Sequence, residues 1–239
     1  MKKTIYIPLL LILIILACDQ DDKNLARSIS YESEALGSRI ELLAYIPQSM
    51  NTSAPVLYFL DESSPSVLIQ DQANWQKYAN DLKMVIVLIM INDNIYKNYP
   101  GSVDRNFEDY VLEVIDVIDA LYDTKAEKSS RGITGVGYGG GGALSIARHY
   151  PEKFGSVSAI SPTFIGYDII VTDVFDQFSI KITAGDEDFS IETSRGFHSD
   201  LLGLGIEHSY KESSGYTNWR FWQGRVEEHL IFHSDAFKK

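Results

Sequence analysis

The sequence predicts an α/β domain with a mostly parallel central sheet and helices on both faces. Residues 84–91, MVIVLIMI, form a continuous apolar run, which is typical of a central strand covered on both sides. Residues 105–123 repeat apolar side chains at spacings of three and four between acidic ones, which predicts an amphipathic helix. Residues 131–151 run from a strand-like lead-in through six glycines into a helical stretch closed by Pro151. That order predicts strand, tight turn and helix.

The rest of the chain continues the alternation. A polar turn with two prolines separates the first two expected strands. Strands are expected at residues 39–46, 56–60, 155–160, 180–184 and 206–211. Helices are expected at residues 70–82, 143–150 and 192–204, with one more at the C-terminus. A chain of 239 residues suits one such domain better than two.

Composition excludes few functions. With 45% hydrophobic and 23% charged residues, the chain is ordinary globular material. Its net charge of -12 argues against nucleic-acid binding, which needs a basic surface to replace counterions. We interpret the acidic face of helix 105–123 as solvated, because the spacing and the glycine of a calcium loop are absent. No cofactor or metal ion is expected.

Residues 1–17 are expected to be a signal peptide. Lys2 and Lys3 precede an apolar run at residues 5–17, which is too short to span about 30 Å of hydrocarbon. The sequence ILAC at residues 15–18 resembles the lipobox of bacterial lipoproteins, which implies that Cys18 is lipidated and becomes the first residue after cleavage. An ordinary secretory signal with an incidental cysteine is the alternative.

Residues 18–27 are expected to be the lipidated cysteine and a polar tether, and residues 28–239 the folded domain. The acidic residues after Cys18 resemble the surface-export signals of lipoproteins in the Bacteroidetes, although a short acidic run is usually just a solvated tether. The expected location is the bacterial cell envelope, at the outer membrane, with exposure at the cell surface left open. The expected partner there is the lipid bilayer.

Two functional devices use a glycine-rich strand, turn and helix: a phosphate-binding turn and the nucleophile elbow G-x-S-x-G. Residues 135–139 have the spacing of the elbow, GVGYG, and Gly137 stands in the serine position. A dinucleotide fingerprint fits less well, because it normally opens the first βαβ unit and needs an acidic residue about 20 residues later.

The segment from Arg131 to Pro162 resembles the elbow region of esterase D type α/β-hydrolases, a group that includes siderophore (enterochelin) esterases and feruloyl-esterase-like proteins. The matching positions are Arg131, Gly135, Gly139, Gly140, Ala147, Pro151, Phe154, Ser161 and Pro162. The resemblance covers roughly residues 40–235. It implies a single-domain α/β-hydrolase fold and an ester-hydrolysing Ser-His-Asp triad.

Two of the three triad positions that the resemblance implies are substituted. Asp188 matches the G-x-x-D motif whose aspartate orients the histidine, although a polar turn with a helix N-cap would look the same. Counting back from Trp219 and Trp222, the histidine position holds Thr217. Threonine cannot act as a general base near neutral pH. The chain's histidines, none of which occupies the motif position, are His149, His198, His208, His229 and His233.

Residues around the expected cleft also depart from the family pattern. Asp61 fits the loop that would supply one N–H of the oxyanion hole, but Glu62 stands where a glycine is expected. Its carboxylate would repel an oxyanion if it pointed inward, or it faces water. Tyr138, Tyr216 and Trp219 are candidates to stack on a ligand, and are as well suited to the core.

Three hypotheses follow. The first is a catalytically inactive, membrane-anchored pseudo-esterase that binds a ligand or a protein partner. The second is an active carboxylic-ester hydrolase, of the siderophore-ester or carbohydrate-ester type, that uses a displaced nucleophile such as Ser63, Ser161 or Ser214 with a displaced histidine. The third is a structural component of a surface complex.

Overall fold

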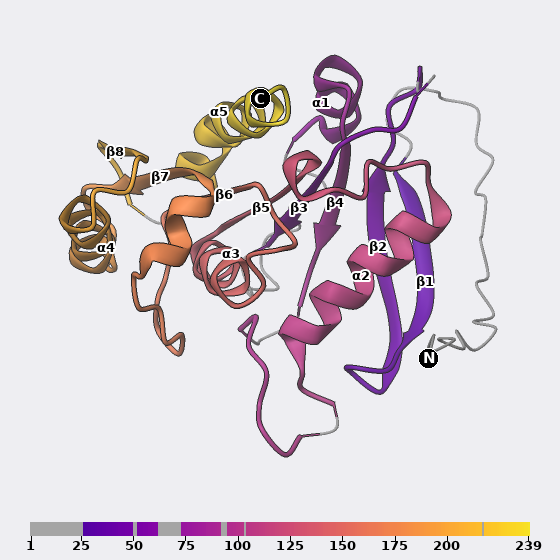
Figure 1. Ribbon diagram of the computed structural model, residues 1–239, viewed down its shortest axis with the longest axis horizontal. Coiled ribbons are helices and arrows are strands. Elements are labelled where there is room, and N and C mark those ends of the chain that lie inside the picture. The colour runs from indigo at the N-terminus through magenta and orange to yellow at the C-terminus, as the bar shows by residue number, and fades with distance from the viewer. Residues whose placement is uncertain (1–25, 50–51, 62–72, 92–94, 103, 217) are drawn as a thin grey trace.

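The computed structural model describes residues 26–49, 52–61, 73–91, 95–102, 104–216 and 218–239 (Figure 1). Its centre is an eight-stranded sheet in the order β1-β2-β4-β3-β5-β6-β7-β8. The strands are β1 (Arg27–Ser33), β2 (Ser38–Tyr45), β3 (Val56–Leu60), β4 (Val85–Ile89), β5 (Arg131–Val136), β6 (Ser156–Ile160), β7 (Ser179–Gly185) and β8 (Ser209–Ser213). β1 and β2 are antiparallel to their neighbours, and the other pairs are parallel. The expected mostly parallel sheet is confirmed.

Helices cover both faces of the sheet (Figure 1). They are α1 (Trp75–Leu82), α2 (Phe107–Leu121), α3 (Gly137–His149), α4 (Ile191–Gly203) and α5 (Trp219–Ala236), with short 3-10 turns η2 (Lys128–Ser130) and η3 (Asp173–Gln177). α2, α3 and α4 contribute to the larger core cluster, and α1 and α5 to the smaller one. The layered arrangement follows from the apolar strands, since both faces must be shielded from water.

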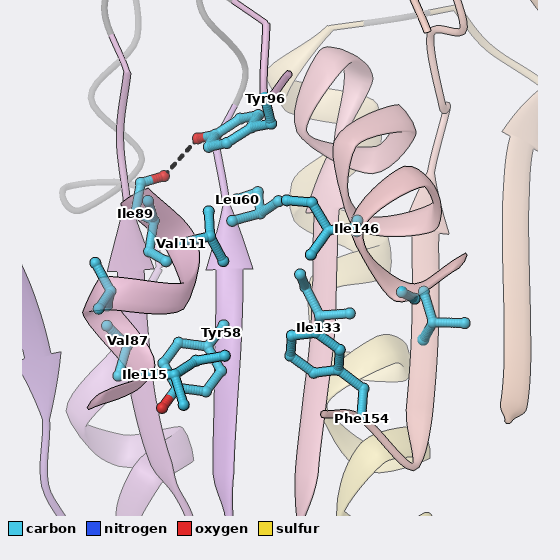
Figure 2. Packing of buried hydrophobic residues seen from close by; sticks show 14 of the residues in the cluster. Tyr58, Leu60, Val87, Ile89, Tyr96, Val111, Ile115, Ile133, Ile146 and Phe154 are labelled. Atoms are coloured by element: carbon cyan, nitrogen blue, oxygen red, sulfur yellow. Dashed lines mark hydrogen bonds between the residues drawn. The ribbon is translucent and has the colours of Figure 1, made fainter. Parts of the chain in front are cut away.

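The two central strands explain the long apolar run. Every residue of β3 and β4 is buried. Tyr58 and Leu60 face the cluster beneath α2 and α3, while Leu57 and Phe59 face the opposite cluster. Figure 2 shows the larger cluster, in which Val111 and Ile115 of α2 lie over β3 and β4. Because successive strand residues point to opposite faces, a strand covered on both sides has to be apolar throughout.

Among the differences from the sequence predictions, two concern the residue at which an element begins, and one adds a strand. α3 begins at Gly137 rather than at residue 143, so the glycine run forms its first turns instead of a loop. β8 begins at Ser209 rather than at residue 206, because Gly205, with φ +71°, and Ile206, whose N–H donates to Leu201 O, still belong to the end of α4. β1 was not expected and extends the sheet from Arg27. The predictions for residues 1–17 and for Cys18 lie outside the described residues.

Candidate functional site

The carboxyl end of β5 turns sharply into α3 at Gly137. Val136 has an extended backbone, with φ -115° and ψ 146°, and Gly137 follows as the first residue of α3 with φ +51°. A left-handed conformation at this point is unfavourable for residues with a Cβ and costs glycine nothing. The strand, turn and helix expected from the glycine spacing are therefore present, with Gly137 on the turn itself.

Close backbone packing holds the loop after β3 against this turn. A Cβ on Gly139 would lie 2.2 Å from the carbonyl oxygen of Leu60 and 2.7 Å from that of Asp61. Asp61 is 7% exposed and donates its N–H to the carbonyl of Ile89. Asp61 therefore lies next to the elbow, as predicted, because Gly139 has no Cβ to keep the two backbones apart. Glu62 lies outside the described residues.

Two tyrosines, Tyr96 and Tyr167, hold the first turn of α3 in place through hydrogen bonds. The hydroxyl of Tyr167 donates to the carbonyl oxygen of Tyr138 at 3.0 Å and accepts the N–H of Tyr96 at 2.8 Å. Tyr96 donates its own hydroxyl to Ile89 O at 2.7 Å (Figure 2). Burial raises the pKa of Tyr96 well above its usual value, so the group stays a neutral donor. The side chain of Tyr138 is half-buried beside Gly137.

The loop after β6 lies next to Gly137. β5 and β6 end at the paired residues Val136 and Ile160, so Gly137 and Ser161 leave the sheet side by side. Thr163 donates its N–H to the carbonyl of Gly137 at 2.8 Å. Ser161 has φ +47° and is fully buried, and its hydroxyl has no hydrogen-bond partner within the described part of the chain.

The three candidate replacement nucleophiles are in different situations. Ser161 lies beside the elbow, but its hydroxyl is enclosed by the protein. Ser214 is exposed in the loop after β8. Ser63 lies outside the described residues. Of the two described serines, only Ser161 is adjacent to Gly137.

Asp188 lies in the loop after β7, where the resemblance predicted the triad carboxylate. It is 3% exposed, and its Oδ2 accepts the N–H of Gly185 at 2.7 Å. Gly215 approaches the same loop, because its carbonyl accepts the N–H of Glu187 at 2.9 Å. Asp188 therefore lies close to the segment that leads to Thr217, which is itself outside the described residues.

The histidines occupy other parts of the fold. His149 ends α3, about 18 Å along the helix from Gly137, and its Nδ1 lies 3.0 Å from Glu108 Oε2. Nδ1 of His198 lies 2.6 Å from Nε2 of His208, which precedes the amino end of β8. These three histidines are not placed at the edge of the sheet where β5 turns into α3.

His229 and His233 form a buried polar network beneath α5. Nε2 of His229 lies 3.0 Å from the hydroxyl of Thr183, and its Nδ1 lies 2.9 Å from that of Ser158. His233 bridges the hydroxyls of Ser158 and Ser156, at 2.9 Å and 2.7 Å. Burial lowers the pKa of His229 well below its usual value and that of His233 to about 3. Both imidazoles are therefore neutral, and their nitrogen atoms are already engaged.

The sequence analysis did not identify this network. Its one signal is the spacing of four residues between His229 and His233, which puts both on one face of a helix together with Val226 and Leu230. The hydroxyl residues that contact them, Ser156, Ser158 and Thr183, come from two strands, β6 and β7, which are distant from α5 in the sequence. Only the sheet order brings these partners together.

The described residues contain no group of three or more His, Cys, Asp and Glu side chains arranged to hold a metal ion. In the same residues, no helix is both long and apolar enough to cross a bilayer.

A parallel sheet with helices on both faces and a sharp strand-to-helix turn at a positive φ defines an α/β-hydrolase fold. The family model described as "Putative esterase" matches residues 33–168. Because that match spans more than half of the chain, the protein belongs to this esterase family.

Several solved structures have a similar fold. The fluorophosphonate-binding serine hydrolase F of Staphylococcus aureus superposes with a TM-score of 0.77 at 16% identity, over 88% of this chain and 98% of that one. An S-formylglutathione hydrolase from Agrobacterium tumefaciens superposes with a TM-score of 0.76 at 18% identity, over 94% of this chain and 100% of that one. The enterobactin esterase of Shigella flexneri superposes with a TM-score of 0.71 at 16% identity, over 92% of this chain and 61% of that one. At these identities the likeness concerns the fold.

Proposed function

We propose that this protein is a pseudo-esterase, which keeps the edge of the sheet for binding and has lost ester hydrolysis. The observation that carries the proposal is Gly137, which stands on the elbow turn with φ +51° and has no side chain to act as a nucleophile. In an active family member a serine would carry the strain of this conformation, about 1 to 3 kcal/mol. Glycine removes that strain together with the chemistry.

The surroundings of the histidines support the same proposal. Nucleophilic catalysis by serine needs a base within hydrogen-bond reach. His229 and His233 are held in the network beneath α5, and His149 lies at the far end of α3. With Thr217 in the histidine position, Asp188 is the one triad residue that keeps its type. A protease that has lost its triad still accelerates hydrolysis about 10³- to 10⁴-fold over water through its oxyanion hole and substrate binding. Any residual activity here should therefore be far below that of an intact esterase.

The rim of this edge indicates the chemistry of the ligand. Ile165, Phe189 and Tyr216 are exposed by 61%, 65% and 58%, and they come from the loops after β6, β7 and β8. Three large apolar side chains around one edge favour a ligand with an apolar or aromatic group, or a protein partner. A carboxylic ester or its acid fits both the rim and the family.

Ester hydrolysis by a displaced nucleophile is the second candidate function, and the position of Ser161 favours it. It is a non-glycine residue with φ +47° directly beside Gly137, and strained backbone of this kind clusters at functional sites. The activity would be that of a carboxylic-ester hydrolase of the siderophore-ester or carbohydrate-ester type. Against it, the hydroxyl of Ser161 is enclosed.

We also propose that the chain is held at the cell envelope by acyl groups on Cys18. A structural role in a surface complex is the third hypothesis, and co-purification of partner proteins would test it. The ILAC sequence and the absence of other cysteines support lipidation.

The decisive experiment compares ester hydrolysis by the purified chain with that by Gly137→Ser, Thr217→His and the double variant, using short-chain aryl esters and a fluorophosphonate label. We expect hydrolysis and labelling only in the double variant, because nucleophile and base are both needed. Adding Asp188→Asn to the double variant should reduce the rate again. Turnover and labelling of the unmodified chain would contradict the proposal, and their loss in Ser161→Ala would then identify the displaced nucleophile.

A further inference from the structure

Two histidines face each other beside the amino end of β8. Nδ1 of His198, on α4, lies 2.6 Å from Nε2 of His208. Both side chains are half-buried, and their rings are inclined by 67°. At this separation one nitrogen carries a proton and donates it in a hydrogen bond to the other, which is unprotonated.

Neighbouring groups fix the orientation of both rings. Nδ1 of His208 donates to the carbonyl oxygen of Ile206 at 2.8 Å, which leaves the lone pair on Nε2 directed at His198. The ring of His198 stacks on Tyr210, with centroids 4.2 Å apart and planes inclined by 9°. An imidazole whose one nitrogen donates to a backbone carbonyl, so that its second nitrogen is unprotonated, has the arrangement that proteins use for metal ligands.

We propose that His198 and His208 bind a divalent transition metal ion of the zinc, nickel or copper class. Imidazole nitrogen suits these metals. Bonds of about 2.0 to 2.1 Å would place the two nitrogens roughly 3 Å apart, so a small separation of the rings admits the ion. His198 then carries its ring proton on Nε2 instead of Nδ1, and no proton is released.

The surroundings leave room for the rest of the coordination sphere. His208 lines a cavity of about 330 Å³ together with Glu207, Ser209 and Phe232, which admits water. Glu212 is an unsuitable ligand, because its carboxylate already accepts hydrogen bonds from the guanidinium of Arg195, at 2.7 Å and 2.9 Å, and from the hydroxyl of Tyr210. Since the described residues supply no group of three metal-binding side chains, water completes the sphere and the site remains open.

This site is separate from the elbow and independent of the proposed function. β8 runs parallel to β7 and, through the sheet, to β5. His208 precedes the amino end of β8, while Gly137 follows the carboxyl end of β5. An ion bound here would link α4 to β8 on the outer strand of the sheet.

The test is calorimetric titration of the EDTA-treated full chain with zinc chloride. We expect one ion per chain, and a loss of affinity of at least about tenfold in both His198→Gln and His208→Gln, since outer-shell losses alone cost 10- to 100-fold. His149→Gln is the control, because it removes a half-exposed histidine elsewhere and should leave the affinity unchanged. No binding, or equal affinity in all four proteins, would overturn the proposal.

A second measurement needs no substitution. Electron paramagnetic resonance of the unmodified chain with one equivalent of copper(II) should show coupling to two imidazole nitrogens. A spectrum without imidazole nitrogen would refute the site, even if a variant proved too unstable to titrate.

Discussion

The backbone N–H of Thr163 donates to the carbonyl of Gly137 at 2.8 Å, which ties the loop after β6 to the elbow of β5 and α3. A ligand that contacts the elbow therefore meets two adjacent strand ends. In this structure both carry a residue with positive φ, glycine in one and Ser161 in the other.

Substituting Gly137 by serine should destabilise the fold even where it restores a nucleophile. A side chain at φ +51° costs about 1 to 2 kcal/mol. Urea denaturation should show this loss in Gly137→Ser and in Gly137→Ala alike, because the strain comes from the Cβ. Unchanged stability in both variants would show that the turn relaxes.

The glycines that follow differ in what surrounds them. A Cβ on Gly141 would lie 2.1 Å from the carbonyl oxygen of Thr163, whereas a Cβ on Gly224, inside α5, would meet nothing within 4 Å. We expect Gly141→Ala to lose about 1 to 3 kcal/mol of unfolding free energy, and Gly224→Ala to gain roughly 0.5 to 1 kcal/mol. Thermal and urea unfolding of the two variants provide the check, and similar shifts in both would contradict the packing argument.

Acid should unfold the protein partly through His229 and His233. Their folded pKa values are lowered, so below about pH 6.5 the unfolded chain binds protons that the folded chain does not. Stability should fall with decreasing pH from there down to about pH 3, where His233 titrates in the folded state. The slope is about 1.4 kcal/mol per pH unit for each histidine once the unfolded state is fully protonated.

Unfolding free energies at pH 7 and pH 5 test this dependence. His233→Gln should be less stable at pH 7, because the hydroxyls of Ser156 and Ser158 lose a partner, but it should lose less stability on going to pH 5. The unmodified protein serves as the comparison. If His233→Gln loses as much stability between pH 7 and pH 5, the network is not the acid-sensitive element.

Lipidation of Cys18 can be tested in cells. Replacing Cys18 by alanine should abolish incorporation of a labelled fatty acid and move the chain out of the membrane fraction. Lys23→Ala, in the expected tether, should do neither. Label incorporation that survives Cys18→Ala would exclude this cysteine as the acceptor.

Sequence patterns predicted the sheet and the elbow well. The run at residues 84–91 and the helix at residues 105–123 depend on burial alone, which periodicity reports directly. Helix boundaries near Gly137 were less accurate, because glycine usually interrupts a helix. Here the first turns of α3 need glycine at 139 and 141, since the backbones of Leu60 and Thr163 come too close for a Cβ.

The chain's own residue types establish the absence of serine at position 137 and of histidine at position 217, and no folding can restore those groups. Tertiary structure alone decided where the histidines lie. His229 and His233 meet hydroxyls from β6 and β7, and His198 meets His208 across α4 and the segment before β8. These contacts depend on the packing of helices against a parallel sheet, which joins residues that local patterns cannot relate.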